Sequence, residues 1–274
     1  MPIPPSWING VRGDSVASTD RGLQYGDGLF ETITCVAGQP RWLPLHLERL
    51  HRGCKRLQLP FDLFDALVAE IGDLAASGER CIVKVLLTRG PALRRGYAPG
   101  GDETPTRILR RYEWPPDDPR AAEGLRVGLS PVVLGANPLL AGLKHLNRLE
   151  QVMAQAAMRP LPLDEVLMLS SAGHVISGSM SNVFFADADG LFTPSLSDCG
   201  VEGIMRRRVC EAAQRYGRPV NVRQVLLQEL AQVQEAFLTN VRWELQSVAS
   251  LAGRSLAGRR EAQAVRRWLD ATPA

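Results

Sequence analysis

A stretch rich in proline and charge, EWPPDDPRAAEG at residues 113–124, most constrains how this chain can fold. It has neither the alternation of a strand nor the apolar spacing of a helix, so it predicts a linker. Residues 116–124 therefore separate a smaller N-terminal domain, 1–115, from a larger C-terminal domain, 125–274. With 274 residues, the chain can form two such domains with a hydrophobic core in each.

The first half alternates strand and helix patterns. Residues 28–38 predict a strand that ends in a turn, and apolar residues at helical spacing predict helices over 45–57 and 61–78. The apolar runs at 81–90 and 106–114 predict two more strands. The order of elements is typical of an α/β or α+β domain.

The second half follows the same plan. Residues 125–134 predict a strand and 144–158 a helix. A series of strands with short turns is expected over 164–194, and a helix over 203–217 that ends at Gly217. We therefore expect a two-domain α/β (α+β) fold, with the cleft between the domains as the default ligand site.

Composition narrows the class of partner. A net charge of +3, with arginines interleaved among acids, argues against nucleic acid as the main ligand. No apolar run reaches the roughly 18–20 residues of a membrane span. Five widely spaced cysteines favour a reducing cytoplasm. No metal site is expected, since His46 and His51 are poorly spaced for ligation and DADG at 187–190 predicts a turn.

Lysine is rare in this chain: Lys55, Lys84 and Lys144 are the only ones among 32 basic residues. A lysine amine can be deprotonated to form an imine, whereas the pKa of arginine stays above about 12. Lys55 lies among arginines, which indicates a solvated basic surface. Lys84 lies in an apolar strand and is expected to face outward or to extend its ammonium to solvent. For Lys144, the local pattern leaves both a surface group and a Schiff-base lysine open.

Five motifs occur in a definite order: STDRGLQYGDGLFET at 18–32, HLERL at 46–50, KHLNRLEQV at 144–152, SGSMSNVFF at 177–185 and GIMRRRV at 203–209. Together they resemble the fold-type IV pyridoxal-phosphate enzymes, which include branched-chain and D-amino-acid aminotransferases and 4-amino-4-deoxychorismate lyase. The segment GANPLLAGLKHLNRLEQV is more similar to the lyase branch than to the transaminases. The resemblance implies a homodimer that binds pyridoxal 5'-phosphate and, for the lyase branch, the small molecule aminodeoxychorismate.

The resemblance also implies roles for individual residues. Lys144 would hold the cofactor as a Schiff base and move the substrate proton, assisted by Thr32. An arginine makes bidentate bonds to phosphate, and the family's phosphate-binding arginine corresponds to Arg49. The remaining implied cofactor contacts are at the start of a helix and in nearby strands, namely Ser177, Asn182, Gly203, Ile204, Met205, Thr239, Asn240 and Val241. The residues expected to line the substrate pocket are Tyr25, Phe30, Arg94, Tyr97 and Arg107.

One residue departs from the family pattern. The family places a glutamate against the pyridine nitrogen, and the corresponding residue here is Ser177 in VISGSMSN. A carboxylate keeps the ring protonated and strongly electron-withdrawing, whereas a neutral hydroxyl does so poorly. Ser177 therefore favours elimination, in which formation of an aromatic ring supplies part of the driving force. Weakened activity is the alternative consequence of the same replacement. The alternatives are a branched-chain or D-amino-acid aminotransferase and a catalytically silent binding protein on the same scaffold.

Overall fold

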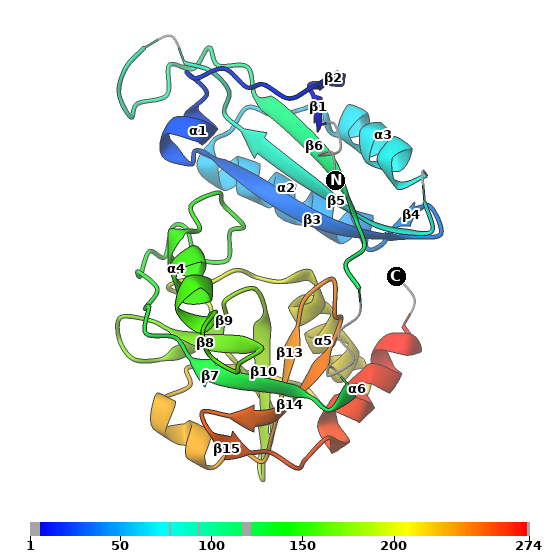
Figure 1. The fold of residues 1–274 in the computed structure, drawn as a ribbon, viewed down its shortest axis with the longest axis vertical. Coiled ribbons are helices and arrows are strands. Elements are labelled where there is room, and N and C mark those ends of the chain that lie inside the picture. The colour runs from blue at the N-terminus through cyan, green and yellow to red at the C-terminus, as the bar shows by residue number, and fades with distance from the viewer. Residues whose placement is uncertain (1–5, 77, 93, 117–121, 273–274) are drawn as a thin grey trace. The chain divides into compact units, whose positions relative to one another are not determined.

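The computed structural model describes residues 6–76, 78–92, 94–116 and 122–272 (Figure 1). The chain divides into two compact units. The first comprises Met1–Pro116 and Leu143–Asn147, and the second comprises Asp117–Gly142 and Arg148–Ala274. The predicted linker lies at this division, although 117–121 fall outside the described residues. The short segment with Lys144, which we expected in the C-terminal domain, is part of the first unit.

The first unit is built on one antiparallel sheet with strand order β2-β1-β6-β5-β3-β4. Its strands are β1 Ser6–Ile8, β2 Val11–Gly13, β3 Gly28–Val36, β4 Gln39–Pro40, β5 Arg80–Thr88 and β6 Thr106–Glu113. Its helices are α1 Arg21–Tyr25, α2 Leu43–Leu57 and α3 Phe64–Ala75. β3 and β4 form a hairpin because Ala37 and Gly38 both adopt positive φ, as a two-residue turn of this hand requires.

The two faces of this sheet have different surroundings. Leu29, Ile33 and Cys35 on β3 lie in one hydrophobic core with residues of β5, α2 and α3. Because side chains alternate along a strand, Phe30 and Thr32 lie on the opposite face. Helix α2 packs on the first face with a buried stripe of His46, Arg49, Leu50, Gly53 and Cys54. This buried stripe includes two polar residues, His46 and Arg49.

The second unit contains a mixed nine-stranded sheet. The strand order is β12-β11-β10-β13-β14-β7-β8-β9, with β15 beside β14. The strands are β7 Leu125–Leu129, β8 Glu165–Leu169, β9 Val175–Gly178, β10 Asn182–Asp187, β11 Gly190–Pro194, β12 Asn221–Arg223, β13 Glu235–Thr239, β14 Gln246–Leu251 and β15 Arg254–Ser255. The helices are α4 Leu149–Met158, α5 Ile204–Arg215 and α6 Arg260–Asp270, with a 3-10 helix at Leu227–Ala231. Large apolar side chains such as Phe185, Phe192 and Leu238 form its core.

Most of the predicted helices and strands are present, but one helix begins later than predicted. The strands at 28–36, 80–88 and 106–113 and the α5 helix match the sequence patterns. The helix expected over 144–158 begins only at Leu149. Residues 143–147 are extended because Leu146 and Phe30 form backbone hydrogen bonds with Gly28 and Lys144, respectively. Within the described residues, no helix is both long and apolar enough to cross a membrane.

Candidate functional site

Lys144 is fixed at the edge of the first unit's sheet. The Phe30 N–H donates to the Lys144 carbonyl over 2.9 Å, and the Leu146 N–H donates to the Gly28 carbonyl over 3.0 Å. Its side chain is half-buried, and its ammonium lies 4.1 Å from the centre of the Phe30 ring. This geometry favours a cation–π contact and holds the amine on the face that α2 and α3 do not cover.

Thr32 and Lys84 lie on the same face as Phe30. Thr32 is directly opposite Lys84 in the β3–β5 register, and Phe30 is opposite Leu86. The Lys84 ammonium lies 5.5 Å from the centre of the Phe30 ring, and the residue is half-buried. Lys84 was expected to face outward or to extend its ammonium to solvent. It does lie on the face away from the helices, but its ammonium is beside the Phe30 ring. Two of the three lysines in the chain thus flank one aromatic ring.

Arg49, the predicted phosphate ligand, forms a buried ion pair on the other face. Its Nε and Nη2 donate to the Glu31 carboxylate over 2.8 and 2.5 Å, and His46 Nδ1 lies 2.6 Å from the same carboxylate. Burial would raise the pKa of Glu31, but Arg49 and then His46 lower it to about 2. The pairing therefore fixes the direction of the Arg49 guanidinium. Its role in holding phosphate stays a prediction.

The structure separates Arg107 from the other predicted substrate residues. Arg107 lies on the helix face of β6, where its Nε and Nη2 donate to Glu70 of α3 over 2.6 and 2.5 Å. Both side chains are buried. To contact a ligand on the face of Phe30, Arg107 would have to break this pair and cross the sheet.

Tyr25 and Tyr97 do lie together. Their rings contact edge to face with centroids 5.4 Å apart. Arg21 holds the second tyrosine's loop by donating to the Gly96 and Tyr97 carbonyls over 3.1 and 2.6 Å. Tyr97 is 84% exposed, and Arg94 is exposed in the same loop. This loop therefore presents polar side chains without a fixed partner for the Tyr97 hydroxyl among the described residues.

In the second unit, Gly203, Asn182 and Thr239 converge at the start of α5. Gly203 is the N-cap, and the helix has no side-chain cap there. The Gly203 N–H donates to Asn182 Oδ1 over 3.1 Å, and a Cβ at Gly203 would lie 2.1 Å from that oxygen. Any side chain at this position would therefore displace the Asn182 amide from its hydrogen bond with the Gly203 N–H. Thr239 is directly opposite Asn182 in the β10–β13 register.

The same site leaves donors available for an anion. The Thr239 hydroxyl is buried and has no hydrogen-bond partner in the described structure. A helix N-terminus attracts an anion because its first N–H groups lack intrahelical partners. Asn240 contributes differently, since its side-chain oxygen accepts from the Arg242 and Trp243 N–H groups and shapes the turn. The residues at Gly203–Met205 and Thr239 thus fit a phosphate group.

Ser177 lies on β9 with its hydroxyl donating to the Gly178 carbonyl over 2.8 Å. Ser177 and Asn182 flank a turn that hydrogen-bonds to Glu165, a residue that our sequence analysis did not single out. This fully buried glutamate accepts from the Ser179 and Met180 N–H groups and from the Ser181 hydroxyl over 3.1, 3.3 and 3.0 Å. A lone acid at the start of the apolar run EVLML was the available signal. Glu165 thereby fixes the turn between two predicted cofactor contacts.

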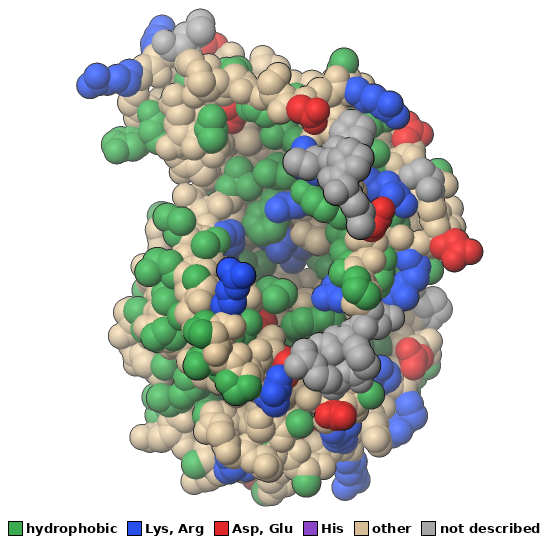
Figure 2. Space-filling view, viewed as in Figure 1, with side chains coloured by type: hydrophobic (Ala, Val, Ile, Leu, Met, Phe, Trp, Pro, Cys, Tyr) green, Lys and Arg blue, Asp and Glu red, His purple; other side chains and the backbone are tan. Residues whose placement is uncertain are grey.

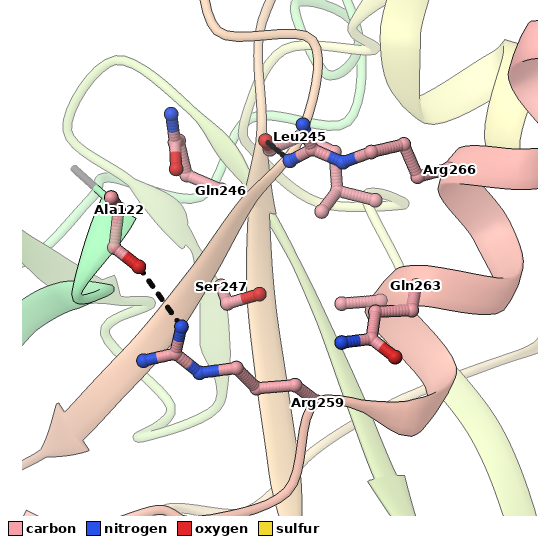
Figure 3. A pocket seen from close by; sticks show the side chains of 8 residues that line it. Ala122, Leu245, Gln246, Ser247, Arg259, Gln263 and Arg266 are labelled. Atoms are coloured by element: carbon pink, nitrogen blue, oxygen red, sulfur yellow. Dashed lines mark hydrogen bonds between the residues drawn. The ribbon is translucent and has the colours of Figure 1, made fainter.

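A cavity of about 300 Å³ lies elsewhere in the second unit (Figure 3). Arg259 donates to the Ala122 carbonyl over 3.0 Å, and Arg266 donates to the Leu245 carbonyl over 2.8 Å. The predicted site residues do not line this cavity, and backbone oxygens already accept from its guanidinium groups. We therefore do not assign the chemistry to it.

Comparisons with known proteins agree with the motifs. The model of the family "Amino-transferase class IV" matches residues 28–251. Aminodeoxychorismate lyase from Vibrio harveyi is 34% identical over 248 residues, which cover 90% of each chain. The crystal structure of 4-amino-4-deoxychorismate lyase from Pseudomonas aeruginosa has 39% identity and a TM-score of 0.90 and covers 97% of each chain. A putative branched-chain-amino-acid aminotransferase from Methanocaldococcus jannaschii is 28% identical over 243 residues, 87% of this chain and 83% of the other.

Proposed function

Because this chain belongs to the amino-transferase class IV family, we propose that it is a 4-amino-4-deoxychorismate lyase. It uses pyridoxal 5'-phosphate to release 4-aminobenzoate, a folate precursor, and pyruvate. The observation that carries this proposal is similarity to two lyases over at least 90% of the chain, above the identity to the aminotransferase. The two-domain fold that the motifs imply agrees with the high structural similarity to one of these lyases.

The residues that would hold the cofactor are those of the family motifs and of the open start of α5. The Lys144 amine would bind the cofactor's aldehyde carbon until the substrate amine replaces it, which frees Lys144 to act as a base. The N–H groups of Ile204 and Met205 would donate to the cofactor's phosphate, with Gly203 allowing the close approach of the backbone, and the Thr239 hydroxyl and Arg49 would complete the contacts. The backbone at Asn240 and Val241 and the side chain of Asn182 complete the phosphate and ring contacts. The contacts at the start of α5 and at Thr239 rest on the open helix N-terminus and the unpartnered buried hydroxyl, and the others rest on the family motifs.

When bound, the cofactor supplies a ring that withdraws electrons from the carbon that carries the substrate amine. Lys144 removes the proton from that ring carbon, with Thr32 placed on the same face to assist the transfer. The electron pair forms a new ring double bond as the neighbouring C–O bond breaks. Enolpyruvate leaves, takes up a proton and becomes pyruvate, and the ring becomes aromatic.

Ser177 supports elimination over transamination. Transamination depends on a protonated ring that can store the electron pair, and a carboxylate stabilises that proton better than a hydroxyl. The Ser177 hydroxyl already donates to the Gly178 carbonyl. An aminotransferase acting on branched-chain or D-amino acids is the second candidate, favoured by the similarity to the archaeal protein.

The expected assembly is a homodimer in the cytoplasm. On α4, the apolar side chains Leu149, Val152 and Met153 are 76, 60 and 57% exposed, which is typical of a surface covered by a partner. Figure 2 shows many hydrophobic side chains on the side where Figure 1 draws α4. A reducing compartment suits Cys35 and Cys81, which face each other across β3 and β5 as free thiols.

A product assay tests the function. The cofactor-loaded enzyme is incubated with aminodeoxychorismate and no keto acid, and pyruvate and 4-aminobenzoate are measured. We expect both in equal amounts. Product formation that requires a keto-acid acceptor would instead support the aminotransferase. Absence of the absorption band of the bound cofactor would support a silent binding protein.

A further inference from the structure

Lys84 has no role in the chemistry described so far, yet the fold places it beside Lys144. Both ammonium groups lie within 5.5 Å of the centre of the Phe30 ring. Lys84 also faces Thr32 across the β3–β5 register. In a chain in which nearly all basic residues are arginines, two of three lysines therefore share one small area of one sheet face.

The surroundings of Lys84 do not neutralise it. Its register partners are Thr32 on β3 and Arg110 on β6, and the next pair along this face is Leu86 and Ile108. Arg110 is itself positive and donates to the Ser6 hydroxyl over 2.9 Å. No carboxylate in the part of the chain that the structure describes forms an ion pair with the Lys84 ammonium.

A half-buried ammonium without a counter-ion has lost part of its hydration and has gained only a weak aromatic contact. An anion that binds beside it restores the lost electrostatic stabilisation, so such a position favours anionic ligands. The compact ammonium can direct its donors at one carboxylate, whereas the larger guanidinium would occupy more space beside Phe30. This difference gives a physical reason for a lysine at this position.

We propose that Lys84 binds a carboxylate of the substrate. The inference rests on the proposed function, because aminodeoxychorismate carries two carboxylates besides its amine. Lys144 acts at the carbon that bears the amine, and Lys84 holds a carboxylate against the same sheet face, with both lysine amines near the Phe30 ring. Lys84 is therefore a substrate-binding residue, and its loss should affect substrate affinity more than turnover.

The experiment uses the cofactor-loaded enzyme and its Lys84→Met variant. Methionine has an unbranched side chain of similar length to lysine but carries no charge. Lys84→Arg keeps the charge, and Lys55→Met removes the exposed third lysine on α2 as a matched control. Pyruvate release gives KM and kcat for aminodeoxychorismate. Calorimetry gives the Kd of chorismate, which has both carboxylates and no amine to react. Titrations with 4-hydroxybenzoate and with pyruvate separate the ring carboxylate from the side-chain carboxylate.

We expect Lys84→Met to raise KM and the chorismate Kd by about 10- to 100-fold, the scale of a lost charged hydrogen bond, with kcat changed far less. Lys84→Arg should lose less affinity than Lys84→Met, because it keeps the charge although its guanidinium takes more space beside Phe30, and Lys55→Met should match the wild type. If Lys84→Met loses affinity for only one of 4-hydroxybenzoate and pyruvate, that result shows which substrate carboxylate Lys84 binds and supports the proposal. A chorismate Kd within about twofold of the wild type in Lys84→Met would overturn it.

Two controls keep the result interpretable. If Lys84→Met loses the cofactor or unfolds, Lys84→Gln replaces it, and failure of both variants would show a structural lysine and overturn the proposal. If the wild type holds cofactor but releases no pyruvate, the proposed function fails. The chorismate and monocarboxylate titrations would still decide separately whether Lys84 is a carboxylate site.

Discussion

The two faces of the six-stranded sheet carry cations in opposite electrostatic settings. On the helix face, Arg49 is paired with Glu31 and Arg107 with Glu70, all of them buried. On the other face, Lys84 and Lys144 flank the Phe30 ring, and Lys84 has no carboxylate partner among the described residues. The same strands contribute to both faces, because successive side chains of a strand point to opposite sides of the sheet.

The contrast indicates which cations stabilise the fold and which bind ligands. A buried cation needs a partner at all times, and removing one member of such a pair leaves an uncompensated charge. A half-buried cation without a partner remains available for a ligand. The difference therefore predicts that substitutions of Glu31 and Arg107 lower stability, whereas substitutions of Lys84 and Lys144 change substrate or cofactor binding. Arg49 is expected to do both, because Glu31 holds the guanidinium that is proposed to bind phosphate.

The largest effect is expected for Lys144→Ala. Loss of the amine should abolish covalent attachment of the cofactor and lower kcat by at least about 10²–10⁴-fold, the usual contribution of a positioned acid–base group. Absorption spectra and pyruvate release measure the two effects. In the wild type, borohydride reduction and peptide mapping should find the pyridoxyl group on Lys144. Finding it on Lys84 would show that the roles of the two lysines are reversed.

Glu31→Gln should have the largest effect on stability. The substitution leaves the buried Arg49 guanidinium without its counter-ion, which we expect to lower the free energy of unfolding by about 3–5 kcal/mol. Urea denaturation measures this change, and Asp73→Asn on the exposed side of α3 is the control. An unfolding free energy equal to that of the control variant would show that the ion pair contributes little to stability.

Arg107→Met tests whether Arg107 stabilises the fold through Glu70 or binds the substrate. It removes one member of the buried pair with Glu70 and should lower the free energy of unfolding by about 3 kcal/mol. At a temperature where the variant remains folded, KM should stay close to the wild-type value. An increase in KM as large as that of Lys84→Met would place Arg107 in the substrate site after all.

Low pH should reduce the free energy of unfolding, because protonation of Glu31 removes its ion pair with Arg49. Its pKa falls from 4.5 to about 2, because Arg49 and His46 outweigh the opposing effect of burial. The unfolded chain then binds more protons than the folded one, so this contribution is full above pH 4.5 and is lost as the pH falls toward 2. Urea midpoints between about pH 6 and about pH 3 should fall in the wild type and less steeply in Glu31→Gln. Parallel curves would contradict the assignment.

The smallest effect is expected in the second unit, where the same contrast recurs. Glu165 is buried with its acceptors satisfied, whereas the Thr239 hydroxyl is buried without a partner. Thr239→Val should weaken cofactor retention by about 1 kcal/mol, one hydrogen bond, without lowering the stability of the cofactor-free protein. Equilibrium dialysis against pyridoxal phosphate measures this effect. Lower stability with unchanged retention would indicate a structural hydroxyl.

Local patterns predicted much of the site because some chemistry depends on short segments. The turn at Ala37-Gly38 and the start of α5 at Gly203 follow from residues within a few positions of each other. The motif around Lys144 made its amine the candidate Schiff-base lysine, which stays a prediction, although the segment was expected to be helical and is not. Its extended form depends on hydrogen bonds to Gly28 and Phe30, more than a hundred residues earlier in the chain.

The sequence by itself determined which residues alternate along each strand and which motifs the chain contains. Only the tertiary structure decided which of the two alternating sets α2 and α3 would cover. That choice depends on packing between elements distant in sequence, and it places Arg107 against Glu70 and Lys84 beside Phe30. A single strand has no intrinsic inner face, so the role of a charge on it is fixed only when a helix packs on one side.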